Sequence, residues 1–215
     1  APVMTGSHVD TQPLGGNYDG VYGVLAGLEL LRTFNDHHIE TERDVVLVNW
    51  TNEEGARFAP AMLSSGVWTG QFSEAYAHAR ADHDGITVGE ALDNIGYRGE
   101  APARAFPVYA CYELHIEQGP ILEDEGLDIG LVRAAMGQRW FTLTLDGFAA
   151  HAGTTPMHSR RDALTAFAEL ALKVEEIGYR HAPDGRATIG MAQVTPNSRN
   201  VVPSREIGRT RLNSS

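Results

Sequence analysis

Apolar residues in the first part of the chain recur with two different periods. Residues 19–34 carry apolar side chains at helical spacing, which predicts a helix that begins just after Asp19. Residues 44–51 form a short, almost continuous apolar run, as in a buried parallel strand. Residues 1–5 and 108–115 indicate two further strands, and residues 86–98 indicate one short helix within a loop-rich stretch. Strands that alternate with helices predict an α/β domain with an open, mainly parallel sheet.

The pattern changes near Gly137. Residues 140–146 alternate as a half-exposed antiparallel strand does, and residues 187–195 indicate another strand. Residues 159–178 between them form an amphipathic helix, and Ser159 with Asp162 approximates a capping box at its start. We therefore expect an α/β domain at residues 1–137 and a smaller α+β domain at residues 138–204.

Both ends of the chain are abrupt. Residues 205–215 are polar and aperiodic, and we expect them to be a tail outside both domains. The first residues already indicate a core strand, with no element before it. These features predict that the chain is an internal piece of a longer protein.

Composition and charge exclude several classes of function. The net charge of −11 argues against nucleic acid or an anionic membrane as the main partner. Cys111 is the single cysteine, so an intramolecular disulfide and a cysteine-rich zinc motif are excluded. No apolar run reaches the roughly 18 residues of a transmembrane helix. We expect a cytoplasmic protein whose metal ligands, where it has any, are histidines and carboxylates.

Chemically active side chains follow the predicted strands. His8, Glu53, Glu54 and His115 each lie at the carboxyl end of a strand, where open parallel sheets bind their ligands. Imidazoles and carboxylates are ligands of borderline divalent cations. The positions therefore predict a metal site that is assembled from several loops.

Each of these residues also has a purely structural interpretation. His8 and Asp10 match a pair in which a carboxylate orients a ligating imidazole, although either residue alone is typical of an ordinary turn. Asp19 is either a helix N-cap or is turned back toward His8 by Gly15 and Gly16.

The adjacent carboxylates of Glu53 and Glu54 repel each other unless a cation neutralises them or one is protonated. A metal ligand beside a general base is one use of such a pair, and a solvated loop is the alternative. His115 shares a predicted strand face with Glu113 and Glu117, which also fits an exposed polar stripe. His151, in a turn of small residues, either reaches a substrate or caps a loop.

With these residues assembled, the chain resembles the amidohydrolase branch of the dinuclear-metal aminoacylase/carboxypeptidase superfamily. That branch contains N-carbamoyl-L-amino acid hydrolases, allantoate amidohydrolases and β-ureidopropionases. The resemblance is carried, in family order over residues 1 to about 204, by the strings GSHVDTQPLGGNYDG, NEEGARF, ELHIEQGP, AHAGTTPM with SRRDAL, and PNSRNVVP.

The resemblance implies a role for each site residue. Two divalent ions, Zn²⁺, Mn²⁺ or Co²⁺, would be held by His8, Asp19, Glu54 and His115, with Asp19 between them. Glu53 would be the general base, and Asp10 would orient His8. Substrate would be contacted by Gln118, His151 and Asn200, and His151 would stabilise the developing oxyanion.

The resemblance implies hydrolysis of the carbamoyl or ureido C–N bond of N-carbamoyl-L-amino acids, because the carbamoyl branch carries histidine at the position of His115. Allantoate and β-ureidopropionate hydrolysis, and a metallo-aminoacylase or peptidase activity, are alternatives. The family's last metal-ligand histidine and its substrate-binding arginine are absent, so an inactive fragment with one weak or partial metal site is a further hypothesis. The resemblance further implies that residues 1–137 are part of a metal-binding catalytic domain and residues 138–204 part of a lid or dimerisation domain, through which the full-length protein would form a homodimer.

Overall fold

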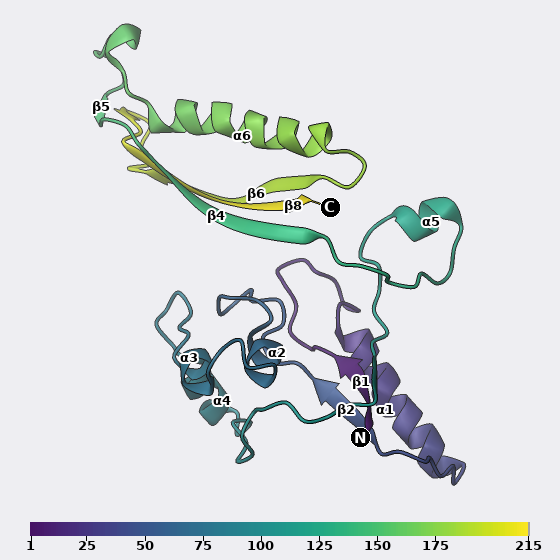
Figure 1. Cartoon of the computed structure of the whole chain (residues 1–215). Helices are drawn as coiled ribbons and strands as arrows, with labels where there is room; N and C mark the ends of the chain where they lie inside the picture. Colours follow the sequence, from purple (N-terminus) through teal and green to yellow (C-terminus); the bar gives the residue numbers. More distant parts are fainter. Residues whose placement is uncertain (215) are drawn as a thin grey trace. The chain divides into compact units, whose positions relative to one another are not determined.

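The computed structural model describes residues 1–214, which divide into two compact units. The first unit is Ala1–Gly130 and the second begins at Leu131, so the division falls slightly before the expected change at Gly137. The first unit contains a parallel sheet and the second an antiparallel one, which confirms the predicted α/β class with a smaller α+β unit (Figure 1). None of the helices in the described part of the chain is long and apolar enough to cross a membrane.

The sheet of the first unit has three parallel strands, in the order β2-β1-β3. They are β1 (Val3–Ser7), β2 (Val45–Asn49) and β3 (Ala110–Tyr112). Helix α1 (Val21–Asp36) packs on β1 and β2, as the helical spacing predicts. A Cβ added to Gly27 would lie 2.6 Å from the Leu47 Cδ1 atom, so this glycine lets the helix approach the sheet closely.

Three short helices between β2 and β3 form a separate apolar cluster. They are α2 (Leu63–Trp68), α3 (Glu74–His78) and α4 (Val88–Asn94). Helix α4 is the short helix predicted in residues 86–98, and Thr87 with Glu90 forms its capping box. The buried residues of the cluster are Phe58, Leu63, Val67, Ala77 and Val88. One more helix, α5 (Ile121–Glu125), follows β3.

The second unit is a three-stranded antiparallel sheet with one long helix on one face (Figure 1). Its strands, in the order β4-β8-β6, are β4 (Gly137–Asp146), β8 (Arg205–Ser214) and β6 (Arg186–Thr195). The helix is α6 (Ala163–Arg180). The unit also contains a small pair of strands, β5 (Ala150–His151) and β7 (Val201–Val202), and a 3-10 turn, Met157–Ser159.

Helix α6 begins later than the sequence pattern predicts. Asp162 is its N-cap, and the Asp162 carboxylate accepts hydrogen bonds from the backbone N–H groups of Leu164 and Thr165. Ser159 instead ends the 3-10 turn, so the predicted capping box of Ser159 and Asp162 is wrong. Both residues favour helix starts, and Asp162 occupies the cap because the turn already uses Ser159.

Residues 205–214, which we expected to lie outside the second domain, form its central strand, β8. Alternation is present: Glu206, Gly208 and Thr210 are buried, whereas Arg205 and Arg209 are exposed. The buried positions hold two polar residues and a glycine, so hydropathy does not show the strand period of two. Residue 215 lies outside the described residues.

Candidate metal centre

The turn before helix α1 carries Asp19 back to His8, which directly follows β1. Gly20 has φ 64, and a Cβ at this position would overlap the His8 ring. Only glycine combines that backbone conformation with so close an approach. Asp19 is 3% exposed, and its Oδ2 atom accepts a hydrogen bond of 2.8 Å from the Thr11 hydroxyl. Asp19 is therefore not an N-cap, since α1 has no side-chain cap.

Asp10 orients the acidic pair that follows β2. Its two carboxylate oxygens accept the backbone N–H groups of Glu53 and Glu54, at 3.1 Å each. Toward His8, Asp10 presents its backbone carbonyl, 2.6 Å from Nδ1, whereas its carboxylate lies 3.9 Å away. Asp10 thus fixes the His8 ring through its main chain, and its side chain fixes the loop of the two glutamates.

The two histidines of the site face each other through their Nε2 atoms. His115 lies beyond β3, and its Nε2 atom is 3.3 Å from that of His8. Each Nδ1 atom lies beside a backbone carbonyl. For His115, the Nδ1 atom is 2.8 Å from the carbonyl oxygen of Ile116. A carbonyl accepts hydrogen bonds only, so Nδ1 carries the proton of each neutral ring and both Nε2 atoms present lone pairs. Two such lone pairs at this distance favour a cation between them.

Carboxylates surround these two nitrogen atoms. Oδ1 of Asp19 lies 3.5 Å from the His115 Nε2 atom and 3.9 Å from the His8 Nε2 atom. Oε2 of Glu53 lies 3.6 Å from the same nitrogen of His8. Imidazole nitrogens and carboxylate oxygens that converge in this way are the donor set of Zn²⁺ and similar ions.

The pKa values of the acidic residues reflect their crowding. Burial raises the pKa of Glu54 to about 7, and the hydrogen bond and negative charge of Asp19 contribute to the rise. Burial opposes ionisation of Asp19 as well, but hydrogen bonds from Glu54, Thr11 and Gln118 outweigh it and hold the pKa of Asp19 below its ordinary value. Glu54 therefore holds a proton more readily than an ordinary glutamate, and a divalent cation can replace that proton.

Glu53 is also perturbed. Burial raises its pKa above the ordinary value, and the carboxylates of Asp10 and Glu113 add to the rise, while His8 and His115 oppose it. A carboxylate with a raised pKa accepts a proton more readily near neutral pH, as a general base must.

The residues present fit a divalent metal. Two groups have ligand atoms within 4.8 Å of one another, His8 with Asp19 and His115, and His8 with Glu53 and Glu54. The four predicted ligands thus lie in one cluster at the carboxyl edge of the sheet.

Comparison with known proteins identifies the family of the chain. The sequence pattern of Peptidase family M20/M25/M40 matches residues 4–196. The chain belongs to this family. An N-carbamoyl-L-amino-acid amidohydrolase of Rhizobium meliloti is 48% identical over 206 residues, which are 96% of this chain and 50% of that protein. An allantoate amidohydrolase of Bacillus subtilis is 39% identical over 210 residues, which are 94% of this chain and 50% of that protein.

A solved structure indicates the branch of the family. The crystal structure of an amidase of the hydantoinase/carbamoylase family from Burkholderia vietnamiensis matches with a TM-score of 0.93 and 56% identity. The match covers 100% of this chain and 52% of that chain. The chain therefore belongs to the hydantoinase/carbamoylase amidase branch of the M20/M25/M40 family, and it spans about half the length of the relatives it matches.

The predicted substrate-contacting residues of this M20/M25/M40 chain lie in both units. Gln118 has φ 54 and donates a hydrogen bond of 2.8 Å to the Gly15 carbonyl, beside Asp19. His151 and Asn200 lie together in the second unit, where the Asn200 carbonyl accepts the N–H of Ala152 at 2.9 Å. The structure therefore brings Gln118 to the candidate metal centre and groups His151 with Asn200.

Sequence reasoning missed two buried supports of the cluster. The Ser7 hydroxyl donates a hydrogen bond to the Glu113 carboxylate, which joins the end of β1 to the segment that carries His115. The Asn52 side chain donates to the carbonyls of Phe58 and Pro60, at 2.8 and 3.1 Å, and so closes the loop after Glu53. Their positions next to His8 and Glu53 were the available signal.

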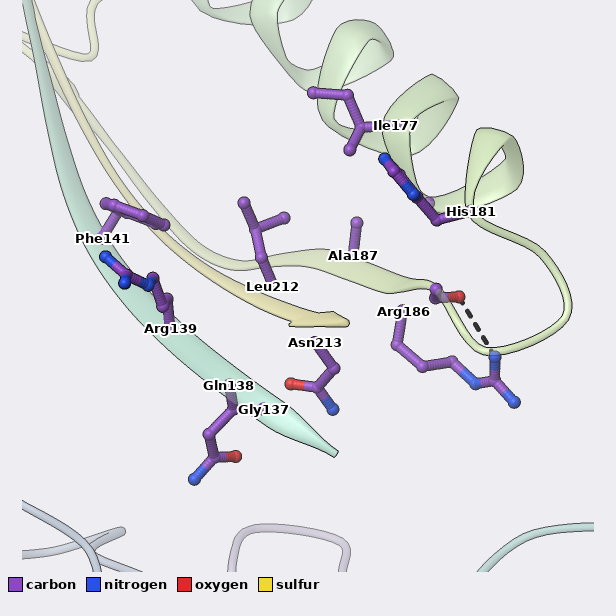
Figure 2. A pocket seen from close by; sticks show the side chains of 12 residues that line it. Gly137, Gln138, Arg139, Phe141, Ile177, His181, Arg186, Ala187, Leu212 and Asn213 are labelled. Atoms are coloured by element: carbon purple, nitrogen blue, oxygen red, sulfur yellow. Dashed lines mark hydrogen bonds between the residues drawn. The ribbon is translucent and has the colours of Figure 1, made fainter. Parts of the chain in front are cut away.

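A groove of about 390 Å³ in the second unit has a different character (Figure 2). Phe141, Leu212 and Ile177 form its apolar lining, between the sheet and the last turns of α6. Arg186 at its rim hydrogen-bonds the carbonyls of Pro183 and Gly185 in its own loop. The groove contains none of the predicted site residues.

Proposed function

We propose that the protein is a metal-dependent amidohydrolase that cleaves the carbamoyl C–N bond of N-carbamoyl-L-amino acids. The observation that carries the proposal is the facing Nε2 pair of His8 and His115, 3.3 Å apart beside Asp19. The 48% identity to an N-carbamoyl-L-amino-acid amidohydrolase supports this choice of substrate. Allantoate is the second candidate substrate, because the allantoate amidohydrolase is 39% identical.

The residues of the cluster divide into ligands and a base. His8, Asp19, Glu54 and His115 would hold two divalent ions, Zn²⁺, Mn²⁺ or Co²⁺, with Asp19 between them. Such ions, when bound, supply an acidified water and polarise the substrate carbonyl. Glu53 takes the proton of the attacking water and returns it to the leaving nitrogen, for which its raised pKa is suited.

The second group of residues would act on the substrate itself. His151 donates a hydrogen bond to the carbonyl oxygen as negative charge develops there, and Asn200 and Gln118 hold the rest of the substrate. The products would be the amino acid, ammonia and carbon dioxide. We further propose that the second unit mediates homodimer formation.

The experiment separates ion binding from turnover. Calorimetric titration of the 215-residue chain with Zn²⁺, Mn²⁺ and Co²⁺ measures the site directly, and we expect weak or partial occupancy and negligible turnover. To measure activity, we would make a hybrid enzyme in which this chain replaces the matching half of the Rhizobium meliloti protein. Ammonia release by the hybrid is then measured with N-carbamoyl-L-amino acids, allantoate, β-ureidopropionate and N-acyl dipeptides as substrates.

Two variants of the hybrid assign the acidic pair. Glu53→Gln should lower kcat roughly 100- to 10,000-fold and leave ion affinity nearly unchanged. Glu54→Gln should instead weaken ion binding by about 10-fold or more. Glu125→Gln, at an exposed position of α5, is the control and should leave both properties unchanged. Hydrolysis of N-acyl dipeptides with no ureido substrate turned over would refute the proposal in favour of an aminoacylase or peptidase.

A further inference from the structure

One arginine side chain, that of Arg160, hydrogen-bonds two backbone carbonyls of the loop that follows His151. Arg160, partly buried, donates from Nε to the Thr155 carbonyl at 3.0 Å and from Nη2 to the Ala152 carbonyl at 2.6 Å. The Thr155 N–H donates to the His151 carbonyl at 3.1 Å, which closes the same turn. A planar guanidinium that binds two carbonyls fixes the path of the chain between them.

This path brings a backbone donor onto the His151 ring. The N–H of Gly153 donates a hydrogen bond of 3.0 Å to Nδ1 of His151. A Cβ at Gly153 would lie 3.2 Å from the Cε1 atom of that ring, so the approach is close enough to favour glycine. Because Nδ1 accepts this bond, the proton of the neutral ring is on Nε2. His8 and His115 have the opposite arrangement, with the proton on Nδ1.

We propose that Arg160 is a positioning residue that sets the tautomer of His151. It holds the carbonyls of Ala152 and Thr155, on either side of Gly153, so that the Gly153 N–H points at Nδ1 and Nε2 keeps the proton. The consequence for catalysis rests on the proposed function. A ring protonated at Nε2 offers a donor to a developing oxyanion, whereas the other tautomer would offer a lone pair to it.

Nitrogen NMR of the histidine rings tests this inference in the chain as it is. In alkaline buffer, where the rings are neutral, long-range proton–nitrogen spectra distinguish a protonated ring nitrogen from one that accepts. We expect His151 to have an accepting Nδ1 and a protonated Nε2. In Arg160→Ala, the population ratio of the two tautomers should fall roughly 3- to 10-fold, the effect of losing one neutral hydrogen bond.

Two further variants control for general disruption. Arg161→Ala removes the neighbouring exposed arginine, whose side chain makes no hydrogen bond within residues 1–214, and should keep the parent ratio. Arg160→Lys can reach one carbonyl and should give an intermediate ratio. If Arg160→Ala loses the dispersed amide signals of β5 and β7, that variant is locally unfolded, and the tautomer ratio in Arg160→Lys tests the inference instead.

Several results would overturn the inference: a parent ring protonated at Nδ1, a parent-like ratio in a folded Arg160→Ala chain, or an unchanged ratio in Arg160→Lys. The spectra need no substrate and no metal. Failure of the hybrid enzyme to hydrolyse ureido compounds would therefore refute the proposed function and leave the role of Arg160 intact.

Discussion

Two carboxyl groups among the residues that the structure describes are almost completely buried, and their surroundings differ sharply. Asp19, 3% exposed, lies at the edge of the parallel sheet and has a hydroxyl, a carboxyl and an amide as hydrogen-bond partners. Glu206, 0% exposed, lies near the start of β8, the central strand of the antiparallel sheet, and neither of its carboxylate oxygens has a hydrogen-bond partner among the described residues. The Asp19 carboxyl group is therefore part of the candidate metal centre, whereas the Glu206 carboxyl group is not.

The difference shows how the cost of burying a carboxyl group is met in one unit and left uncompensated in the other. Around Asp19, the histidines and the hydrogen-bonded loops make a place where a cation stabilises the whole arrangement. Glu206 is paired with Leu145 on β4 and Val194 on β6, so its side chain lies in an apolar layer. A buried polar group without a partner costs about 1–3 kcal/mol, and a charged one more. We infer that backbone pairing on both sides of β8 outweighs this cost.

The largest change in the free energy of unfolding should follow from removing the Glu206 carboxyl group. Glu206→Val replaces the carboxyl with a β-branched side chain that suits a central strand and packs against its apolar neighbours. We expect the free energy of unfolding of the second unit to rise by about 2–4 kcal/mol, and each kcal/mol raises the midpoint by about 4–8 °C. Calorimetry with hydrogen exchange of the β8 amides measures both quantities.

A surface glutamate gives the matched control for this experiment. Glu169 is exposed on α6, and Glu169→Ala should change the stability by no more than about 0.5 kcal/mol. Glu206→Gln keeps the shape but leaves polar atoms buried, so its gain should be smaller than that of the valine variant. A parent chain more stable than Glu206→Val would mean that the carboxyl group makes favourable contacts, and the contrast with Asp19 would fail.

The same two regions show what the sequence could and could not reveal. At the Asp19 site, each chemical group follows a strand end or a turn, so residue types and the βαβ pattern were enough to predict that His8, Glu53 and His115 converge. In β8, the residues that face the helix are glutamate, glycine and threonine. Hydropathy carries no strand signal there because these buried residues are not apolar, and β8 forms through pairing with β4 and β6, which lie elsewhere in the sequence.

Finer details of the site depend on backbone geometry that single residue types do not encode. Asp10 was expected to orient His8 with its carboxylate, but it does so with its carbonyl and uses the carboxylate on the loop of Glu53. The close contact between Gly20 and the His8 ring likewise requires the three-dimensional path of the turn.

A change in stability of intermediate size should follow from disturbing the contact between Gly20 and the His8 ring. Gly20→Ala places a methyl group against the His8 ring at φ 64, and we expect the first unit to lose about 2–3 kcal/mol and to bind Zn²⁺ about 10-fold more weakly. Gly96→Ala is the matched control, since Gly96 has φ 69 with nothing within 4 Å. It should cost only about 1 kcal/mol and leave Zn²⁺ affinity unchanged. Equal effects of the two variants on Zn²⁺ titrations would show that the contact does not position the ligands.

The smallest effect should be a pH dependence that belongs to the Asp19 site. In the ion-free chain the pKa of Glu54 is raised from 4.5 to about 7, so between these pH values the folded state binds more protons than the unfolded state. Stability from Glu54 is then complete below its ordinary pKa and is lost as the pH rises through about 7. Allowing for solvent screening, we expect a loss of about 1–2 kcal/mol.

Urea unfolding followed by the fluorescence of Trp50 and Trp68, both in the first unit, measures this dependence. Glu54→Gln should flatten most of it, and the raised pKa of Glu53 leaves a remainder of the same sign. The lowered pKa of Asp19 acts in the opposite direction, since its stabilisation is lost as the pH falls below 3.8. Saturating Zn²⁺ should reverse the slope, because the ion binds the deprotonated ligands. An ion-free chain that gains stability from pH 4.5 to 7 would show that Glu54 is not crowded by Asp19.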